Sequence, residues 1–180
     1  MNGEIVEWLE TQGAADIDHP GGTLLQHLRR TETLLAAWGA TGHAQCVALL
    51  HATYGTDGFG PSLLKLDDRR VVRDLAGVDV EADVYLYASC DRAKTYPGLA
   101  AGDRRMADRF TGRVLEVGHD RVRQFMELTA ANELDVLVHS DRLRALHAPG
   151  IAGWLDACAD YLSAPAVAAL NTFHAKYLST

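Results

Sequence analysis

The stretch GGTLLQHLRRTETLLAAWG, residues 21–39, decides much of the expected fold. Its leucines recur at helical spacing, so the segment predicts an amphipathic helix with one buried face. Thr23 is expected to cap the first turn, and Gly39 stands where a left-handed residue commonly ends a helix. His27 follows Leu24 by three residues and lies on or beside the apolar stripe, so we expect its side chain to point inward.

Helical periodicity continues on both sides of this segment, which predicts an all-α helical bundle. Aspartates are expected at the N-caps of two of these helices, Asp67 and Asp79. Weak alternation near 109–117 allows one short β-hairpin. Loops or turns are expected over Tyr96–Gly102 and His147–Gly150. The expected helices are Glu4–Gln12, 24–38, Thr41–Thr53, Asp67–Ala76, Asp79–Arg92, Asp120–His139, Ile151–Leu162 and Pro165–Leu178.

Length and composition limit the classes to which this protein can belong. The 180 residues predict one domain over 1–180, and the net charge of −7 disfavours nucleic acid as a partner. No apolar run approaches the roughly 18 residues that a membrane span needs. The start of the chain lacks the basic and apolar regions of an export signal, so a cytoplasmic location is expected. Three cysteines without a C-x-x-C pair are expected to be buried thiols.

Three of the eight histidines stand at positions that could converge. His27 faces the core of its helix, and His51 ends a very apolar helix just before the glycine-rich loop Tyr54–Pro61. His19 lies in Asp-His-Pro-Gly-Gly-Thr, where two glycines let the backbone fold closely over what lies beneath, as a lid would. A histidine with a pKa near neutrality is suited to proton transfer, although each of these could equally be a satisfied core residue.

Several segments resemble the signature helices of the HD-domain superfamily. They are GTLLQHL at 22–28, ALLHATYGTD at 48–57 and TAANEL at 129–134, and the resemblance spans roughly residues 15–140. The sequence is still more similar to an uncharacterised bacterial branch of that superfamily, known only as a domain of unknown function. The resemblance implies an HD-like helical bundle that holds a divalent metal through two histidines and two aspartates.

The chain departs from that pattern at both carboxylates. His27 and His51 match the family's histidines, whereas Ala52 and Asn132 stand in place of the aspartates. Two imidazoles and an amide make a weak cage for magnesium or manganese, which prefer oxygen anions. We therefore expect no cofactor, and keep iron, zinc, nickel or manganese at His27 and His51 as an alternative. The replacement ligands would then be Asp57, Asp135 or His139, and the last two share a helix face with Asn132.

The sequence thus predicts a small-molecule enzyme that uses metal-independent acid/base chemistry, of the isomerase, lyase, cyclase or hydrolase type. The candidate catalytic residues are His19, His27, His51, Tyr54 and Asp57, and the candidate substrate-binding residues are Thr53, Arg92 and Asn132. Two alternatives stay open: a metal-dependent phosphohydrolase or oxygenase of HD type, and a non-catalytic ligand-binding or regulatory domain. The apolar faces of the last two helices allow a homodimer.

Overall fold

The computed structural model describes residues 2–179 and is mostly helical, as the periodicity predicts; Met1 and Thr180 lie outside the described residues. The helices are α1 (Asn2–Thr11), α2 (Leu24–Ala37), α3 (Gly42–Leu50), α4 (Arg69–Ala76), α5 (Val78–Ser89), α6 (Arg92–Ala100), α7 (His119–His139), α8 (Asp141–Ala157) and α9 (Ala164–Tyr177). Short 3₁₀ turns cover Leu66–Asp68 and Ala159–Tyr161. The strands are β1 (Asp18–His19), β2 (Gly22–Thr23), β3 (Arg105–Ala107) and β4 (Val114–Glu116).

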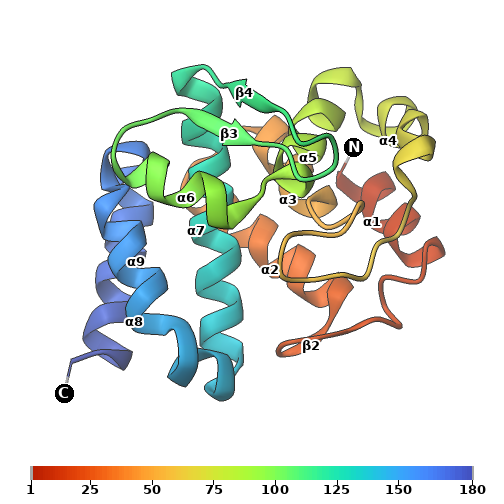
Figure 1. Ribbon diagram of the computed structural model, residues 1–180. Coiled ribbons are helices and arrows are strands. Elements are labelled where there is room, and N and C mark those ends of the chain that lie inside the picture. The colour runs from red at the N-terminus through yellow and green to blue at the C-terminus, as the bar shows by residue number, and fades with distance from the viewer. Residues whose placement is uncertain (1, 180) are drawn as a thin grey trace.

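Helix α7 runs through the middle of the bundle (Figure 1). Helices α2 and α3 pack against each other and against α7, while α8 and α9 cover the other side of α7. Twelve side chains of α7 are buried, which explains why its sequence is apolar on more than one face. The arrangement brings residues of α2, α3 and α7 that are about a hundred positions apart into direct contact.

Helix α2 begins as the sequence predicts. The Thr23 hydroxyl accepts a hydrogen bond from the Gln26 backbone at 3.3 Å, and the Gln26 side chain accepts one from the Thr23 backbone at 3.1 Å. This reciprocal capping box satisfies two of the free N–H groups at the helix start. Gly39 has a φ of +82°, so the expected left-handed residue after the helix is also confirmed.

The two small hairpins differ from the expectation in place and number. Strand β4 lies inside the expected 109–117 region, but its antiparallel partner β3 lies before that region, with Met106 opposite Leu115. A second hairpin pairs Asp18 with Thr23 and His19 with Gly22. Two-residue strands carry too little periodicity to be read from sequence, and the glycines at 21 and 22 supply the positive φ values that this turn needs.

Two expected non-helical segments are helical in the structure. The sequence predicts a loop over Tyr96–Gly102, but α6 continues through Pro97 to Ala100. The expected turn at His147–Gly150 lies inside α8, which continues through Pro149. Each proline removes one helical hydrogen bond, and tertiary contacts outweigh that loss. Trp154 stacks on Tyr96 with 3.9 Å between ring centroids and donates a hydrogen bond to the Tyr96 carbonyl oxygen.

The expected aspartate caps of α4 and α5 are wrong. Helix α4 follows a 3₁₀ turn and has Asp68, without a side-chain cap bond, at its N-cap. Gly77 stands at the N-cap of α5, so Asp79 lies within the first turn instead. Gly77 ends one helix and begins the next, because its φ of +95° permits an abrupt change of direction.

The buried side chains form a contiguous hydrophobic cluster that draws on nearly all of the helices. All three cysteines, Cys46, Cys90 and Cys158, are buried free thiols, which confirms the expectation. Within residues 2–179, no helix is long and apolar enough to cross a membrane. Buried polar groups gather where α2, α3 and α7 meet, around His27 and His51.

Candidate functional site

His27 of α2 is the centre of the polar groups in the core. Its side chain is 1% exposed and lies between two residues of α7. Nδ1 of His27 is 2.6 Å from an Asp135 carboxylate oxygen, and Nε2 is 3.1 Å from the Asn132 amide oxygen. Both ring nitrogens of His27 therefore face oxygen atoms of α7 side chains. Nδ2 of Asn132 is turned away from His27 and donates to Glu133.

Asp135 is buried but its charge is compensated. Arg30 reaches it with two hydrogen bonds, from Nε at 2.6 Å and from Nη2 at 3.0 Å. Burial alone would raise the pKa of Asp135, but the hydrogen bonds and charges of His27 and Arg30 lower it below its usual range. Asp135 is therefore an ionised carboxylate that orients His27, as the aspartate of a catalytic dyad does.

The polar network continues from Asn132 to the start of α6. Glu133 accepts hydrogen bonds from Asn132 Nδ2 at 3.2 Å and from Arg92 Nη1 at 2.8 Å. The backbone N–H of Arg92 in turn donates to the Asp57 carboxylate at 2.8 Å. Asp57 therefore holds the start of α6 in place, and it makes no hydrogen bond to a histidine among the described residues. Arg92 and Asn132, by contrast, belong to the network as predicted.

His51 is the second histidine of the site and caps the end of α3. Its side chain is 1% exposed, and its Nδ1 donates to the Ala48 carbonyl oxygen at 2.7 Å. The hydrogen on Nδ1 leaves Nε2 as the unprotonated nitrogen of a neutral ring. Burial, followed by the nearby charge of His27, lowers the pKa of His51 to about 3. The ring centroids of His51 and His27 are 5.3 Å apart, so the two predicted residues are indeed neighbours.

His19 covers His27 from the β1–β2 hairpin. The two rings are stacked with centroids 4.0 Å apart, and Phe59 of the glycine-rich loop contacts His19 in an edge-on arrangement. Burial and the charge of His27 lower the pKa of His19 to about 4. Its Nδ1 is buried without a hydrogen-bond partner of good geometry. His19, His27 and His51 thus form one histidine cluster, and the hairpin closes it on the outside.

Arg30 connects the hairpin to the rest of the site. Besides Asp135, its guanidinium donates to the carbonyl oxygens of Pro20 and Gly21, both at 3.2 Å. Gly21 has a φ of +78°, and a Cβ at this position would lie 2.5 Å from Cβ of His139. Only glycine therefore lets the hairpin approach α7 this closely.

Removing the Arg30 side chain should loosen the hairpin. We expect Arg30→Met to increase amide hydrogen exchange over residues 18–23 by about tenfold or more, because two carbonyl contacts and the link to Asp135 are lost together. Exchange measured by mass spectrometry checks this. The matched control is Arg29→Met, on the same helix and without an ion pair among the described residues; equal loosening in both variants would contradict the assignment.

Two tyrosines place buried hydroxyl groups beside this network. The Tyr87 ring contacts His51, with centroids 5.2 Å apart, and the Arg92 guanidinium lies 6.0 Å from the Tyr87 ring centroid and 5.8 Å from that of Tyr96. Within residues 2–179, neither hydroxyl has a hydrogen-bond partner of good geometry, although Thr129 lies near that of Tyr87. Unsatisfied buried polar groups are rare, and a polar ligand or ordered water is the usual explanation.

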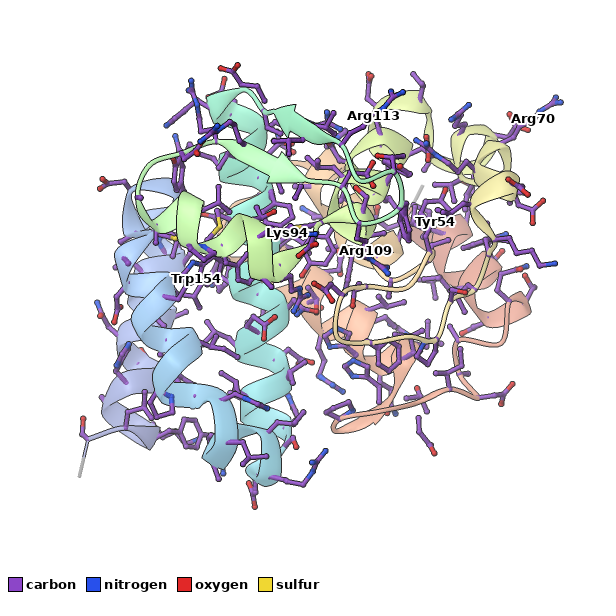
Figure 2. All side chains as sticks on the ribbon, in the orientation of Figure 1. Tyr54, Arg70, Lys94, Arg109, Arg113 and Trp154 are labelled. Atoms are coloured by element: carbon purple, nitrogen blue, oxygen red, sulfur yellow. The ribbon has the colours of Figure 1, made fainter. Side chains whose placement is uncertain are left out.

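A small pocket opens beside these tyrosines and is named the Arg92 pocket here. Its volume is about 180 Å³. Trp154 lies on its α8 side, and Figure 2 shows this residue near α6. The pocket is lined by Arg92, Tyr96, Glu133, Gly150, Ile151 and Trp154. It therefore gives solvent a route to the Arg92–Glu133 end of the network.

Tyr54 is engaged away from the histidines, whereas Thr53 follows His51 by two residues. The Tyr54 hydroxyl donates to Glu81 at 3.3 Å, within a separate cluster in which Arg69 and Arg73 bind the same carboxylate. In Figure 2 Tyr54 lies well away from Trp154, on the other side of the view. Burial and the charge of Glu81 raise the pKa of Tyr54, which makes it a poor proton donor. The hydroxyl of Thr53 is buried without a partner, and its carbonyl oxygen accepts from the Leu63 and Leu64 backbone.

The donor set does not fit a divalent metal ion in this arrangement. Both nitrogens of His27 are engaged by Asp135 and Asn132, which leaves the Nε2 atom of His51 as a free donor. Within residues 2–179, no group of three or more His, Cys, Asp or Glu side chains is arranged to hold a metal. Of the suggested replacement ligands, Asp135 is committed to Arg30, and Asp57 to the start of α6. A metal role for His27 and His51 stays a prediction.

Sequence reasoning missed several residues of this site. Arg30 follows His27 by three positions and so shares its helix face, which was a usable signal. Glu133, Tyr87 and Tyr96 gave no such signal, because their neighbours in the site come from other helices. The sequence suggests Asp135 only as a replacement metal ligand, whereas this residue is 3% exposed and binds His27.

The comparisons with known proteins assign no chemistry to this chain. A family model described as "Domain of unknown function (DUF6817)" matches residues 8–92. The matched part contains His19, His27 and His51 and ends at Arg92, whereas Asn132 and Asp135 of α7 lie beyond it. No curated protein and no solved structure matches the chain. Over residues 8–92, the chain is therefore similar to a family whose description names no activity.

Proposed function

We propose that this chain is a small-molecule-processing enzyme that performs metal-independent acid/base chemistry at the histidine cluster. The observation that carries the proposal is the pairing of two buried imidazoles with different hydrogen-bond partners. His51 is neutral with its Nε2 free, and His27 is held between the Asp135 carboxylate and the Asn132 amide oxygen. A neutral imidazole accepts a proton and an imidazolium supplies one, which isomerases, lyases, cyclases and hydrolases all require.

The surrounding groups suit a substrate that carries or develops negative charge. Arg92 is a cation that donates from one guanidinium nitrogen, Nη1, to Glu133, and the buried hydroxyls of Tyr87 and Tyr96 belong to the rings nearest its guanidinium. An anion in this space would be stabilised by preorganised donors in a site with little water. It would also raise the pKa of His51, since a nearby negative charge favours the protonated ring, and so make His51 a stronger base.

The proposal includes a distant relation to the HD-domain superfamily, which the meeting of His27, His51 and Asn132 supports. Metal-dependent chemistry of HD type is less well supported, because both nitrogens of His27 are already engaged. One observation favours a second candidate function, a ligand-binding domain without catalysis. His27 and His51 are each 1% exposed, so a reactant would reach them only after the hairpin or the Arg92 pocket opens.

The variant His51→Asn tests the enzymatic proposal. The asparagine amide can still donate to the Ala48 carbonyl oxygen, so the helix end is preserved while Nε2 is removed. We expect a panel of carboxylate and phosphate esters, lactones and enolisable keto acids to contain a substrate, whose turnover falls by at least about 100-fold in the variant. Product formation is followed by mass spectrometry, and folding by circular dichroism.

The control for this experiment is His147→Asn, since His147 is exposed on α8 and far along the chain from the cluster. Its turnover should equal that of the parent protein. Turnover that survives in a folded His51→Asn protein would overturn the assignment of His51 as a base. Saturable binding of a panel compound without turnover would favour the ligand-binding alternative instead.

A further inference from the structure

The molecule has a second hollow, which lies outside the histidine cluster. Its volume is larger than that of the Arg92 pocket. It is a groove of about 600 Å³ between α2, α7 and α9. Figure 1 shows α2 and α9 on either side of α7. Small-molecule sites in proteins occupy about 300–1,000 Å³ and favour the space between helices of a bundle. The size and place of this α2–α7–α9 groove are therefore those of a ligand site.

The floor of the groove is apolar. All three helices contribute apolar side chains to it, and Val138 in the groove is 40% exposed. Each square ångström of apolar surface left in water costs about 25 cal/mol, so a ligand with an apolar body would gain free energy here. The apolar lining residues are Leu34, Leu134, Val138, Ala169, Phe173 and Tyr177.

Two cations stand at this groove without carboxylate partners. Arg29 of α2 and Lys176 of α9 both line it. Among residues 2–179, neither side chain forms an ion pair; Lys176 lies 4.8 Å from the ring centroid of Tyr177. Arg29 also borders a hollow that Glu7, Glu10 and Glu32 line, but within residues 2–179 it forms no ion pair with any of them. Leaving two cations unpaired beside an apolar surface is the arrangement that a bound anion would complete.

Asp135, an acidic residue that lines the groove, is not expected to repel such an anion. Asp135 lines the inner wall, but its carboxylate is 3% exposed and binds both Arg30 and His27. Its charge is therefore compensated before a ligand arrives. The groove shares Asp135 and Arg30 with the site described above, yet ligand binding there does not require that site to be catalytic.

We propose that the α2–α7–α9 groove binds an amphipathic monocarboxylate with an apolar chain of medium length. The chain lies along the floor formed by α7 and α9, and the carboxylate lies between Arg29 and Lys176. The apolar part supplies most of the binding free energy, while the two cations distinguish an acid from a neutral molecule of the same length.

Titration calorimetry with three probes tests this proposal. Decanoate should bind saturably with one site per chain, 1-decanol about tenfold more weakly, and acetate without measurable heat. That factor of ten corresponds to about 1.4 kcal/mol. Chemical shift changes of His139 and Thr172 in the presence of decanoate should place the ligand in the groove.

Two variants test separately how the charge and the shape of the groove contribute to binding. Arg29→Gln combined with Lys176→Gln should weaken decanoate about tenfold and leave 1-decanol unchanged, so the preference for the acid disappears. Ala169→Phe narrows the groove and should weaken both probes alike. The control Arg113→Gln removes one exposed cation near the opposite end of the molecule (Figure 2) and should change neither.

Three results would overturn the proposal. One is the absence of saturable decanoate binding, and another is a preference for the acid that survives the double glutamine variant. The third is a concentration-dependent dimer in sedimentation that decanoate does not dissociate, because a second copy of the chain would then occupy the groove.

Discussion

Asp135→Ala is expected to lower the free energy of unfolding by about 3–5 kcal/mol, since it removes one partner of a buried charged network and leaves the others. His27 would lose the acceptor at its Nδ1, and Arg30 would lose both of its carboxylate contacts. The hairpin would lose its link to α7 at the same time. Urea denaturation followed by circular dichroism gives the free energy of unfolding for the variant and the parent protein.

Asp141→Ala is the matched control for this prediction. Asp141 also pairs with an arginine, Arg144 at 2.5 Å, but its own side chain is 94% exposed. Exposed ion pairs contribute about 0–1 kcal/mol, so this variant should be nearly as stable as the parent protein. If the two variants lost similar amounts of unfolding free energy, the buried Asp135 network would stabilise the protein no more than an exposed ion pair does.

Acid is expected to destabilise this protein from about pH 6.5 downward. The folded state lowers the pKa of His51 to about 3 and that of His19 to about 4, whereas an unfolded histidine titrates near 6.5. The unfolded chain therefore binds protons that the folded chain does not, and stability falls as pH falls through this window. His51 alone contributes a slope of ~1.4 kcal/mol per pH unit, and His19, which is partly exposed, adds less.

The carboxylate of Asp135 also makes stability fall as pH falls, but at a lower pH than the two histidines. Its folded pKa lies below the ordinary 3.8, so its stabilisation is present above that value and is lost as pH falls below it. The shifts of these three groups predict no loss of stability when pH rises from 7 to 8. The window from about pH 6.5 down to about pH 4 therefore reports on the two histidines.

The variant His51→Asn isolates one contribution to this pH dependence. Asparagine does not titrate, so the slope of unfolding free energy between pH 6 and 4.5 should decrease by ~1.4 kcal/mol per unit. Urea midpoints at four pH values across this range provide the measurement. An unchanged slope would show that His51 takes up its proton without unfolding, and its buried neutral state would then be wrong.

The sequence determined the helices that carry the central residues. Leucine spacing, a capping threonine and a left-handed glycine fix α2 through local interactions alone, which also turn His27 inward. The same periodicity predicts α7 and places Asn132 and Asp135 on one face of it. His51 followed from its position at the end of a helix whose residues are nearly all apolar. Local spacing is sufficient for these conclusions, because a helix repeats every 3.6 residues.

Only the tertiary structure decided which polar groups contact each other and which hydrogen bonds each of them forms. Tyr54 stands three residues after His51, yet its hydroxyl binds Glu81; Arg92, which is 41 residues from Glu133, binds its carboxylate. The continuation of α6 through Pro97 and of α8 through Pro149 likewise depends on tertiary contacts such as the stack of Tyr96 on Trp154. The physical reason is that burial and pairing arise between segments distant in sequence. These interactions contribute enough free energy to outweigh local preference for a loop, and no local pattern records them.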